Sequence, residues 1–225
     1  MKLGKQLAVG QSEQRQFQLF FVVGDQGDLV LAAAGGSVGL RFGRGHSSSL
    51  EVCQTQSVPP TIRLLQAKDA APYRELRLRA LTEDPAAYLT SAEEYAQRSP
   101  DEIAARLGAT EQALTLGAFL KTKLIGMATL VRLERYKQRH RADVVSVYVA
   151  PEARGRGVAA ELMRRLIDQA RQQKGLEVLG LRVTETQVAA RRLYEKLGFE
   201  LWGVQPDALR KGEAALTELH LQLKL

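Results

Sequence analysis

The sequence has very little cysteine or histidine. It contains one cysteine, Cys53, among 225 residues, which excludes an internal disulfide framework and a cysteine-based zinc site. Its three histidines, His46, His140 and His220, stand far apart in the sequence and form no metal-ligand spacing. We therefore expect no metal, and the scarcity of cysteine favours a cytoplasmic protein.

Long apolar runs and the common nucleotide-binding loops are also missing. No stretch predicts a membrane span or a clear secretory signal. The chain lacks Gly-x-x-x-x-Gly-Lys-Ser/Thr, and it lacks Gly-x-Gly-x-x-Gly after a strand, which excludes the usual triphosphate and dinucleotide loops. Acidic residues (25) are fewer than Lys and Arg (32), so the net charge is +7. This charge permits an anionic partner, but no basic strand with interleaved aromatic residues supports nucleic acid.

The first part of the chain differs in composition from the rest. Residues 1–61 are rich in Gly, Ser and Gln, with two segments, 17–23 and 29–34, that could form short strands. We interpret residues 1–61 as a weakly structured N-terminal extension. Two prolines at positions 59 and 60 mark its end, and residues 62–225 are predicted to form one globular domain.

Hydrophobic periodicity predicts an α/β domain with a mixed sheet, in the order β-α-α-β-β-β-α-β-α-β-β. The predicted helices are 69–81, 99–107, 158–170 and 187–197. The predicted strands are 62–65, 114–120, 124–133, 144–149, 176–183, 199–204 and 216–223.

Polar residues with capping potential precede two of these helices. Ser99 comes directly before Pro100, Asp101 and Glu102, which predicts a helix that begins at the proline. Thr184 and Gln187 have the spacing of a capping box, which predicts that Thr184 caps the helix near 187–197.

The stretch 144–170 is the most informative part of the chain. A β-branched run ends at Pro151, a loop with the sequence Arg-Gly-Arg-Gly follows at 154–157, and an apolar helix face then recurs every four residues from Val158. The first turn of a helix has unpaired N–H groups, and glycines let a phosphate approach them closely. The stretch therefore predicts a phosphate site.

Two motifs resemble those of a known family. Arg154-x-x-Gly157-x-Ala159 resembles the acetyl-CoA signature of the GNAT superfamily of N-acetyltransferases, although the hexapeptide alone could be a basic turn before a helix. Downstream, Gln187-x-x-Ala190-x-x-Leu193-Tyr194-x-x-x-Gly198-Phe199 resembles the second signature of that family. Gln187 stands where the family usually has asparagine, which puts its contact to the CoA arm in doubt.

The resemblance implies a GNAT-like fold, with a mostly antiparallel twisted sheet flanked by helices. It also implies transfer of an acetyl group from acetyl-CoA to a primary amine by direct attack in a ternary complex. In this family a backbone N–H stabilises the oxyanion, which by position is that of Val149, and a tyrosine matching Tyr194 protonates the leaving thiolate. The cofactor-binding residues that the resemblance implies are Val147, Tyr148, Val149, Arg154, Gly155, Arg156, Gly157, Val158, Ala159 and Gln187.

Several questions stay open at this level. No general base is assigned, and the carboxylates considered are Glu83, Glu94, Asp143 and Glu185. The identity of the amine acceptor, whether a small molecule or a protein, is not determined, and neither is the choice between monomer and homodimer. The main alternative is an acyl-CoA-binding regulatory module without turnover. A nucleic-acid binder is a third hypothesis, which the charge alone supports.

Overall fold

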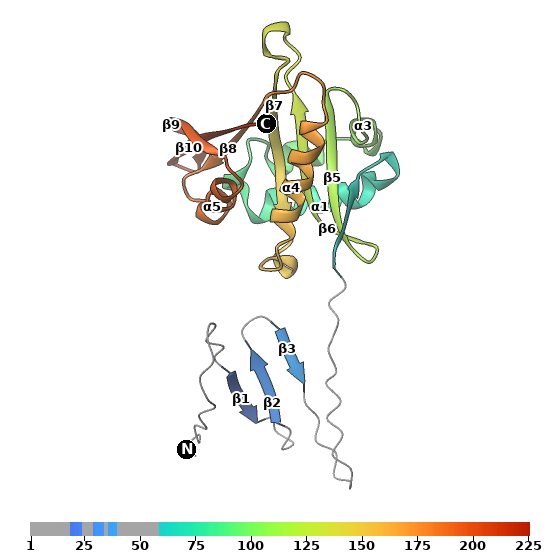
Figure 1. Ribbon diagram of the computed structural model, residues 1–225, viewed down its shortest axis with the longest axis vertical. Helices are drawn as coiled ribbons and strands as arrows, with labels where there is room; N and C mark the ends of the chain where they lie inside the picture. Colours follow the sequence, from blue (N-terminus) through green and yellow to red (C-terminus); the bar gives the residue numbers. More distant parts are fainter. Residues whose placement is uncertain (1–18, 24–28, 34–35, 40–58) are drawn as a thin grey trace. The chain divides into compact units, whose positions relative to one another are not determined.

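The structure is a computed structural model that describes residues 19–23, 29–33, 36–39 and 59–225 (Figure 1). The chain forms two compact units, 1–57 and 58–225. In the first unit, β1 (Leu19–Val23), β2 (Leu29–Ala33) and β3 (Gly36–Gly39) pair as an antiparallel sheet. The rest of the predicted N-terminal extension, up to residue 58, lies outside the described residues.

The second unit is built on a seven-stranded sheet with the spatial order β4-β5-β6-β7-β8-β10-β9. Every neighbouring pair is antiparallel except β7 and β8, which are parallel. The strands are β4 (Thr61–Leu64), β5 (Ala113–Leu120), β6 (Lys123–Arg132), β7 (Arg141–Val149), β8 (Val178–Thr184), β9 (Glu200–Lys211) and β10 (Ala214–Lys224).

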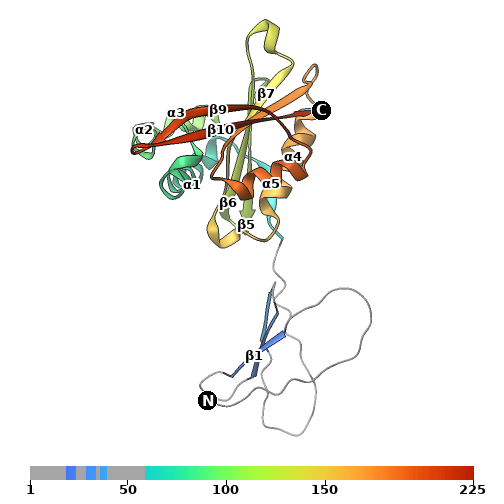
Figure 2. The ribbon, with the colours of Figure 1, turned by 90° about the vertical axis from the view of Figure 1, so that its left-hand side faces the viewer.

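Helices cover both faces of this sheet. They are α1 (Ala70–Glu83), α2 (Ala92–Ala96), α3 (Pro100–Arg106), α4 (Val158–Arg171) and α5 (Val188–Lys196). Figure 2 shows α1 and α4 on opposite faces of the strands β5 and β6. The predicted α/β class with a mixed, mostly antiparallel sheet is confirmed, and the short helix α2 is added to the predicted order.

The apolar face of α4 forms the centre of the larger core. Leu162, Met163 and Leu166 have no exposed surface, and they pack in one cluster with residues of β5, β6 and β7. Their spacing places them on one side of the helix, so the burial of large aliphatic side chains holds α4 against the sheet. On the opposite face, Leu76 and Ala80 of α1 pack in a second cluster with Met127 and Tyr148.

One predicted helix cap is confirmed and the other is wrong. The Ser99 hydroxyl accepts a hydrogen bond from the Glu102 N–H at 3.2 Å, and Glu102 bonds back to the Ser99 N–H, so α3 begins with a capping box. Thr184 does not cap α5: it is the last residue of β8, and Gln187 occupies the N-cap position. Thr184 is part of β8, and a short turn separates Thr184 from the first residue of α5.

Candidate active site

The central feature of the site is the point where the two parallel strands separate. β7 pairs with β8 only through Arg141–Asp143 and Val178–Gly180. Beyond this point β7 continues to Val149 along β6, with a register shift and a positive φ of 55° at Ser146. An extra residue in one strand increases the local twist and bends that strand. The second half of β7 therefore has an edge that β8 does not cover.

Two carbonyl groups of this open edge accept hydrogen bonds from side chains. The Val147 carbonyl accepts a hydrogen bond from the Tyr88 hydroxyl at 3.0 Å, and the Val149 carbonyl accepts one from Arg154 Nε at 2.9 Å. The Ala150 N–H donates to the Ile125 carbonyl of β6 at 2.9 Å. Because backbone donors alternate along a strand, the Val149 N–H points toward the open edge. This is the orientation that an oxyanion donor requires.

A loop with two left-handed glycines leads from β7 into α4. Gly155 and Gly157 have φ values of 75° and 76°, which only glycine adopts without strain, and Gly157 is the N-cap of α4. The Glu161 N–H makes the bond to the Gly157 carbonyl at 3.0 Å that closes the first helical turn. The N–H groups of Val158 and Ala159 precede that bond and have no acceptor within the helix. The helix start can therefore bind an anion.

The two loop arginines have different surroundings. Arg154 Nη2 pairs with Asp84 at 3.0 Å, and its own backbone N–H donates to the Pro151 carbonyl at 3.1 Å, so Arg154 fastens the end of β7. Arg156 is exposed and has no ion pair within the part of the chain that the structure describes. Positive charge for an incoming anion therefore comes from Arg156 and the dipole of α4.

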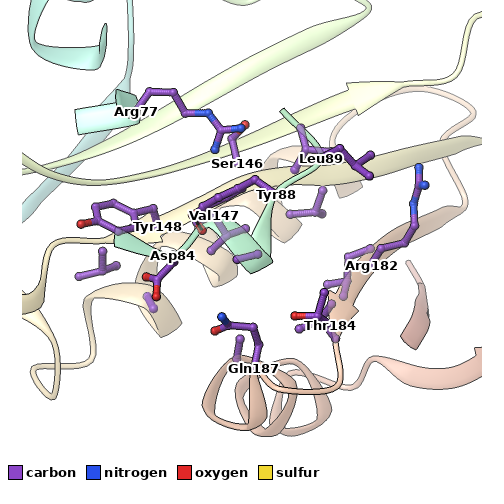
Figure 3. A pocket seen from close by; sticks show the side chains of 18 of the residues that line it. Arg77, Asp84, Tyr88, Leu89, Ser146, Val147, Tyr148, Arg182, Thr184 and Gln187 are labelled. Carbon is purple, nitrogen blue, oxygen red and sulfur yellow. Dashed lines mark hydrogen bonds between the residues drawn. The ribbon is translucent and has the colours of Figure 1, made fainter. Parts of the chain in front are cut away.

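A cavity of about 610 Å³ lies along the open edge of β7 (Figure 3). It brings together seven of the residues singled out from the sequence: Val147, Tyr148, Val149, Arg154, Ala159, Gln187 and Tyr194. The other four, Gly155, Arg156, Gly157 and Val158, belong to the adjoining loop and first helical turn and do not line it. The structure therefore groups one part of the predicted set around a hollow and the rest at the start of α4.

Tyr194 is the buried phenol of this cavity. Its side chain is 7% exposed and packs edge-to-face on Phe199, with 6.1 Å between the ring centroids. Burial raises the pKa of Tyr194 above its ordinary value of 10, because the phenolate is disfavoured away from water. Tyr194 therefore carries its proton at neutral pH and can donate it.

Only one of the four carboxylates considered as a base lines the cavity, and that one is Asp143. Glu83 accepts hydrogen bonds from the Tyr148 hydroxyl and from Arg79, which lower the pKa of Glu83. Glu94 accepts from the backbone at the start of α2, and Glu185 accepts from the Thr217 N–H at 3.3 Å. Each of these three groups is engaged in a structural contact.

A further carboxylate, Glu218, lines the cavity and was missed in the sequence. It is 7% exposed and stands opposite Thr184 in the register of β10 and β8. Its position within an apolar strand, two residues after the buried Leu216, was the available signal. Glu218 lines the cavity because β10 pairs with β8, and hydrophobic periodicity alone does not predict this pairing.

The opposite wall of the cavity comes from residues 73–98. Its polar members are Tyr73, Arg77, Asp84, Tyr88, Thr90, Tyr95 and Arg98. Arg77 and Tyr95 are both buried, although arginine is mostly exposed in proteins and tyrosine is intermediate. Burial raises the pKa of Tyr88 to about 12, so this hydroxyl also remains protonated. From this segment the sequence singled out only the carboxylates Glu83 and Glu94, and neither lines the cavity.

Metal-ligand clusters and membrane-spanning helices are both absent from the described residues. The described residues contain no group of three or more His, Cys, Asp or Glu side chains that could hold a metal ion. Among the described helices, none combines the length and apolar character that crossing a bilayer requires.

Comparisons with known proteins agree with this geometry. The family model described as "Acetyltransferase (GNAT) family" matches residues 76–199, more than half of the chain. The L-methionine sulfoximine/L-methionine sulfone acetyltransferases of Pseudomonas aeruginosa and Pseudomonas paraeruginosa are each 36% identical over 80 residues, which are 36% of this chain and 46% of each relative. The chain thus spans about half the length of the curated relatives it matches.

Two solved structures share the fold. An acetyltransferase of the GNAT family from Streptococcus pneumoniae has a TM-score of 0.63 at 24% identity, covering 74% of this chain and 99% of that one. The Salmonella typhimurium protein yncA, solved with its cofactor acetyl-CoA, has a TM-score of 0.64 at 24% identity, covering 74% and 94%.

Proposed function

Because the chain belongs to the acetyltransferase (GNAT) family, we propose that it moves an acetyl group from acetyl-CoA to a primary amine by direct attack in a ternary complex. The observation that carries the proposal is the separation of β7 from β8 beside the first turn of α4. This geometry offers an exposed strand edge for the acyl arm and unpaired N–H groups for its phosphates, on one continuous stretch of chain.

The cofactor contacts follow from the backbone. The diphosphate lies at the N–H groups from Gly155 to Ala159, where two left-handed glycines leave room for its oxygens. The pantetheine arm follows the open edge of β7 and places the thioester carbonyl at the Val149 N–H. Gln187 faces the same cavity from the start of α5, where its side chain makes no capping bond. Its longer side chain can reach the arm that asparagine contacts in the family.

Groups in the cavity can account for each bond and proton that the acetyl transfer moves. The amine nitrogen bonds to the thioester carbon, charge builds on the carbonyl oxygen at the Val149 N–H, and the C–S bond then breaks. The electron pair goes to sulfur, and the Tyr194 hydroxyl protonates the thiolate. The nitrogen releases one proton, which Asp143, Glu218 or water accepts and which replaces the proton that Tyr194 lost.

The test combines binding and turnover. Acetyl-CoA affinity is measured by calorimetry, and free thiol is followed with a panel of amines that includes L-methionine sulfone, because the curated relatives are named for that compound. Thiol release that depends on one amine class, with an equal amount of acetylated product, supports the proposal. Acetyl-CoA binding without thiol release on any amine would favour the regulatory module, and no measurable affinity for coenzyme A would end both hypotheses.

A further inference from the structure

Arg77 on α1 is a buried cation without a counter-ion. Its side chain is 8% exposed, and its Nη1 atom is buried without a hydrogen-bond partner in the described part of the chain. No carboxylate among the described residues lies within ion-pair distance of it. A buried charge without a partner is strongly unfavourable. An anion that is not part of this chain would relieve that cost.

Two arginines near Arg77 have the carboxylate partners that it lacks among the described residues. Arg79 pairs with Glu83 and Glu152, each at 2.9 Å or less, and Arg154 pairs with Asp84 at 3.0 Å. Arg79 and Arg154 thus each have a carboxylate partner, whereas Arg77, the most buried of the three, has none among the described residues. Arg77 stacks instead on the Tyr88 ring, with its guanidinium carbon 4.3 Å from the ring centroid.

Tyr95, which also lines the cavity, carries a second buried donor without a partner among the described residues. It is 4% exposed, and its hydroxyl is buried without a hydrogen-bond partner among the described residues. Burial raises the pKa of Tyr95 to about 12, so the hydroxyl keeps its proton and can donate it at neutral pH. Both Arg77 and Tyr95 line the cavity. Two residues that line one hollow thus carry buried donors without acceptors in the described part of the chain, and an anion bound beside them would supply those acceptors.

Tyr88 connects this subsite to the reaction centre. Its ring lies under the Arg77 guanidinium, and its hydroxyl donates to the Val147 carbonyl of the open strand edge. Figure 3 shows the Arg77 side chain directed toward Tyr88 and the strand that carries Val147. The Tyr88 side chain therefore lies between an anion bound at Arg77 and the strand edge that faces the thioester.

We propose that Arg77 and Tyr95 form the subsite that binds a carboxylate of the acceptor, so that the acceptor is an amino acid or a similar small amine that carries an acidic group. The planar guanidinium can hold a carboxylate through two parallel hydrogen bonds, which also orients the amine. This inference rests on the proposed acetyl transfer and specifies its acceptor class.

The first test uses the unaltered protein and three matched acceptors: an amino acid, its carboxamide and the amine that decarboxylation would give. We expect kcat/KM for the amino acid to exceed that for each of the other two acceptors about 100-fold. The amine has no acceptor for the two buried donors, and the carboxamide offers one neutral oxygen in place of a charged, two-oxygen carboxylate. Equal kcat/KM values across the three acceptors would overturn the subsite while leaving acetyl transfer intact. No thiol release on any acceptor would instead contradict the proposed function.

The second test separates the subsite from folding. Arg77→Met should raise KM for the amino acid about 100-fold and leave KM for the carboxamide and the affinity for acetyl-CoA nearly unchanged. Arg74→Met is the matched control: Arg74 is on the same helix and also has a buried unpaired nitrogen, but it does not line the cavity. It should leave the preference for the carboxylate unaltered.

Tyr95→Phe provides an independent variant if Arg77→Met does not fold. It removes a single oxygen and should reduce the preference for the amino acid over its carboxamide about tenfold. A Tyr95→Phe protein that retains the full preference, or an Arg77→Met protein that weakens amino acid and carboxamide equally, would contradict the proposal.

Discussion

The cavity wall formed by β7 and α4 presents mainly backbone groups, whereas the wall formed by residues 73–98 presents side chains. On the first wall, the separated strand edge orients N–H groups and Arg154 holds the strand end, and the glycine loop adjoining this wall orients further N–H groups. On the second, Arg77, Tyr88 and Tyr95 converge from α1, α2 and the segment between them. The comparison indicates a division of tasks: backbone groups suit a constant cofactor, and side chains suit a selective acceptor site.

The largest effect should come from Tyr194, the buried phenol of the cavity. Tyr194→Phe should lower kcat about 100-fold or more, because general acid catalysis contributes roughly that amount, while the Kd for acetyl-CoA stays unchanged. Since burial raises the pKa of Tyr194 above 10, the acid remains protonated as pH rises, and wild-type kcat should not fall between pH 7 and about 9. Thiol release measured in a steady-state assay gives kcat, and calorimetry gives the Kd for acetyl-CoA.

Tyr136→Phe is the control for that substitution, because Tyr136 is 84% exposed and does not line the cavity. It should behave as wild type. A Tyr194→Phe enzyme with unaltered kcat would remove the acid assignment.

The backbone wall can be disturbed at one glycine. Gly157→Val places a β-branched side chain at φ 76°, which is strained, so the first turn of α4 should shift and the Kd for acetyl-CoA should rise about tenfold. Gly212→Val is matched, since Gly212 has φ 60° in the turn between β9 and β10 and open space around it. Calorimetry should show normal affinity for the Gly212 variant. Equal losses in both variants would indicate general strain instead of a phosphate site.

The proton acceptor can be tested by comparing two carboxylates of the cavity. Glu218→Gln should lower kcat about tenfold, which is less than general acid–base catalysis usually contributes, because water in the open cavity also accepts a proton. Asp143→Asn should have a smaller effect, since the Asp143 side chain is 32% exposed and that of Glu218 only 10%. Steady-state rates for both variants show which carboxylate contributes more to kcat. A larger loss for Asp143→Asn than for Glu218→Gln would make Asp143 the main proton acceptor.

The smallest effect concerns the support of the side-chain wall. Ser99→Ala removes the cap of α3, whose Ile103 packs in one cluster with Tyr95 and Leu81, and should reduce the free energy of unfolding by about 1 kcal/mol. Denaturant unfolding measures the loss, and the Kd for acetyl-CoA should stay unchanged. A weakened affinity for acetyl-CoA would show that the two walls are coupled.

Much of the backbone wall could be predicted from the sequence because its determinants are local. The β-branched run before Pro151, the glycines of the loop and the four-residue apolar spacing of α4 are read directly, since each acts on its own few residues. The cap at Ser99 was predicted for the same reason. The cap at Thr184 was wrong, because pairing of β8 with β10 extends the strand through that residue.

The sequence by itself determined the α/β class, the strand–loop–helix unit at 144–170 and the tyrosine on α5, because periodicity, glycine and proline act over short distances. Only the tertiary structure decided that β7 and β8 separate after Asp143, that Glu218 lies in the cavity and that Arg77 and Tyr95 bury polar atoms without hydrogen-bond partners among the described residues. These features depend on which distant segments pack together, and burial and pairing across the fold are not encoded in any one segment.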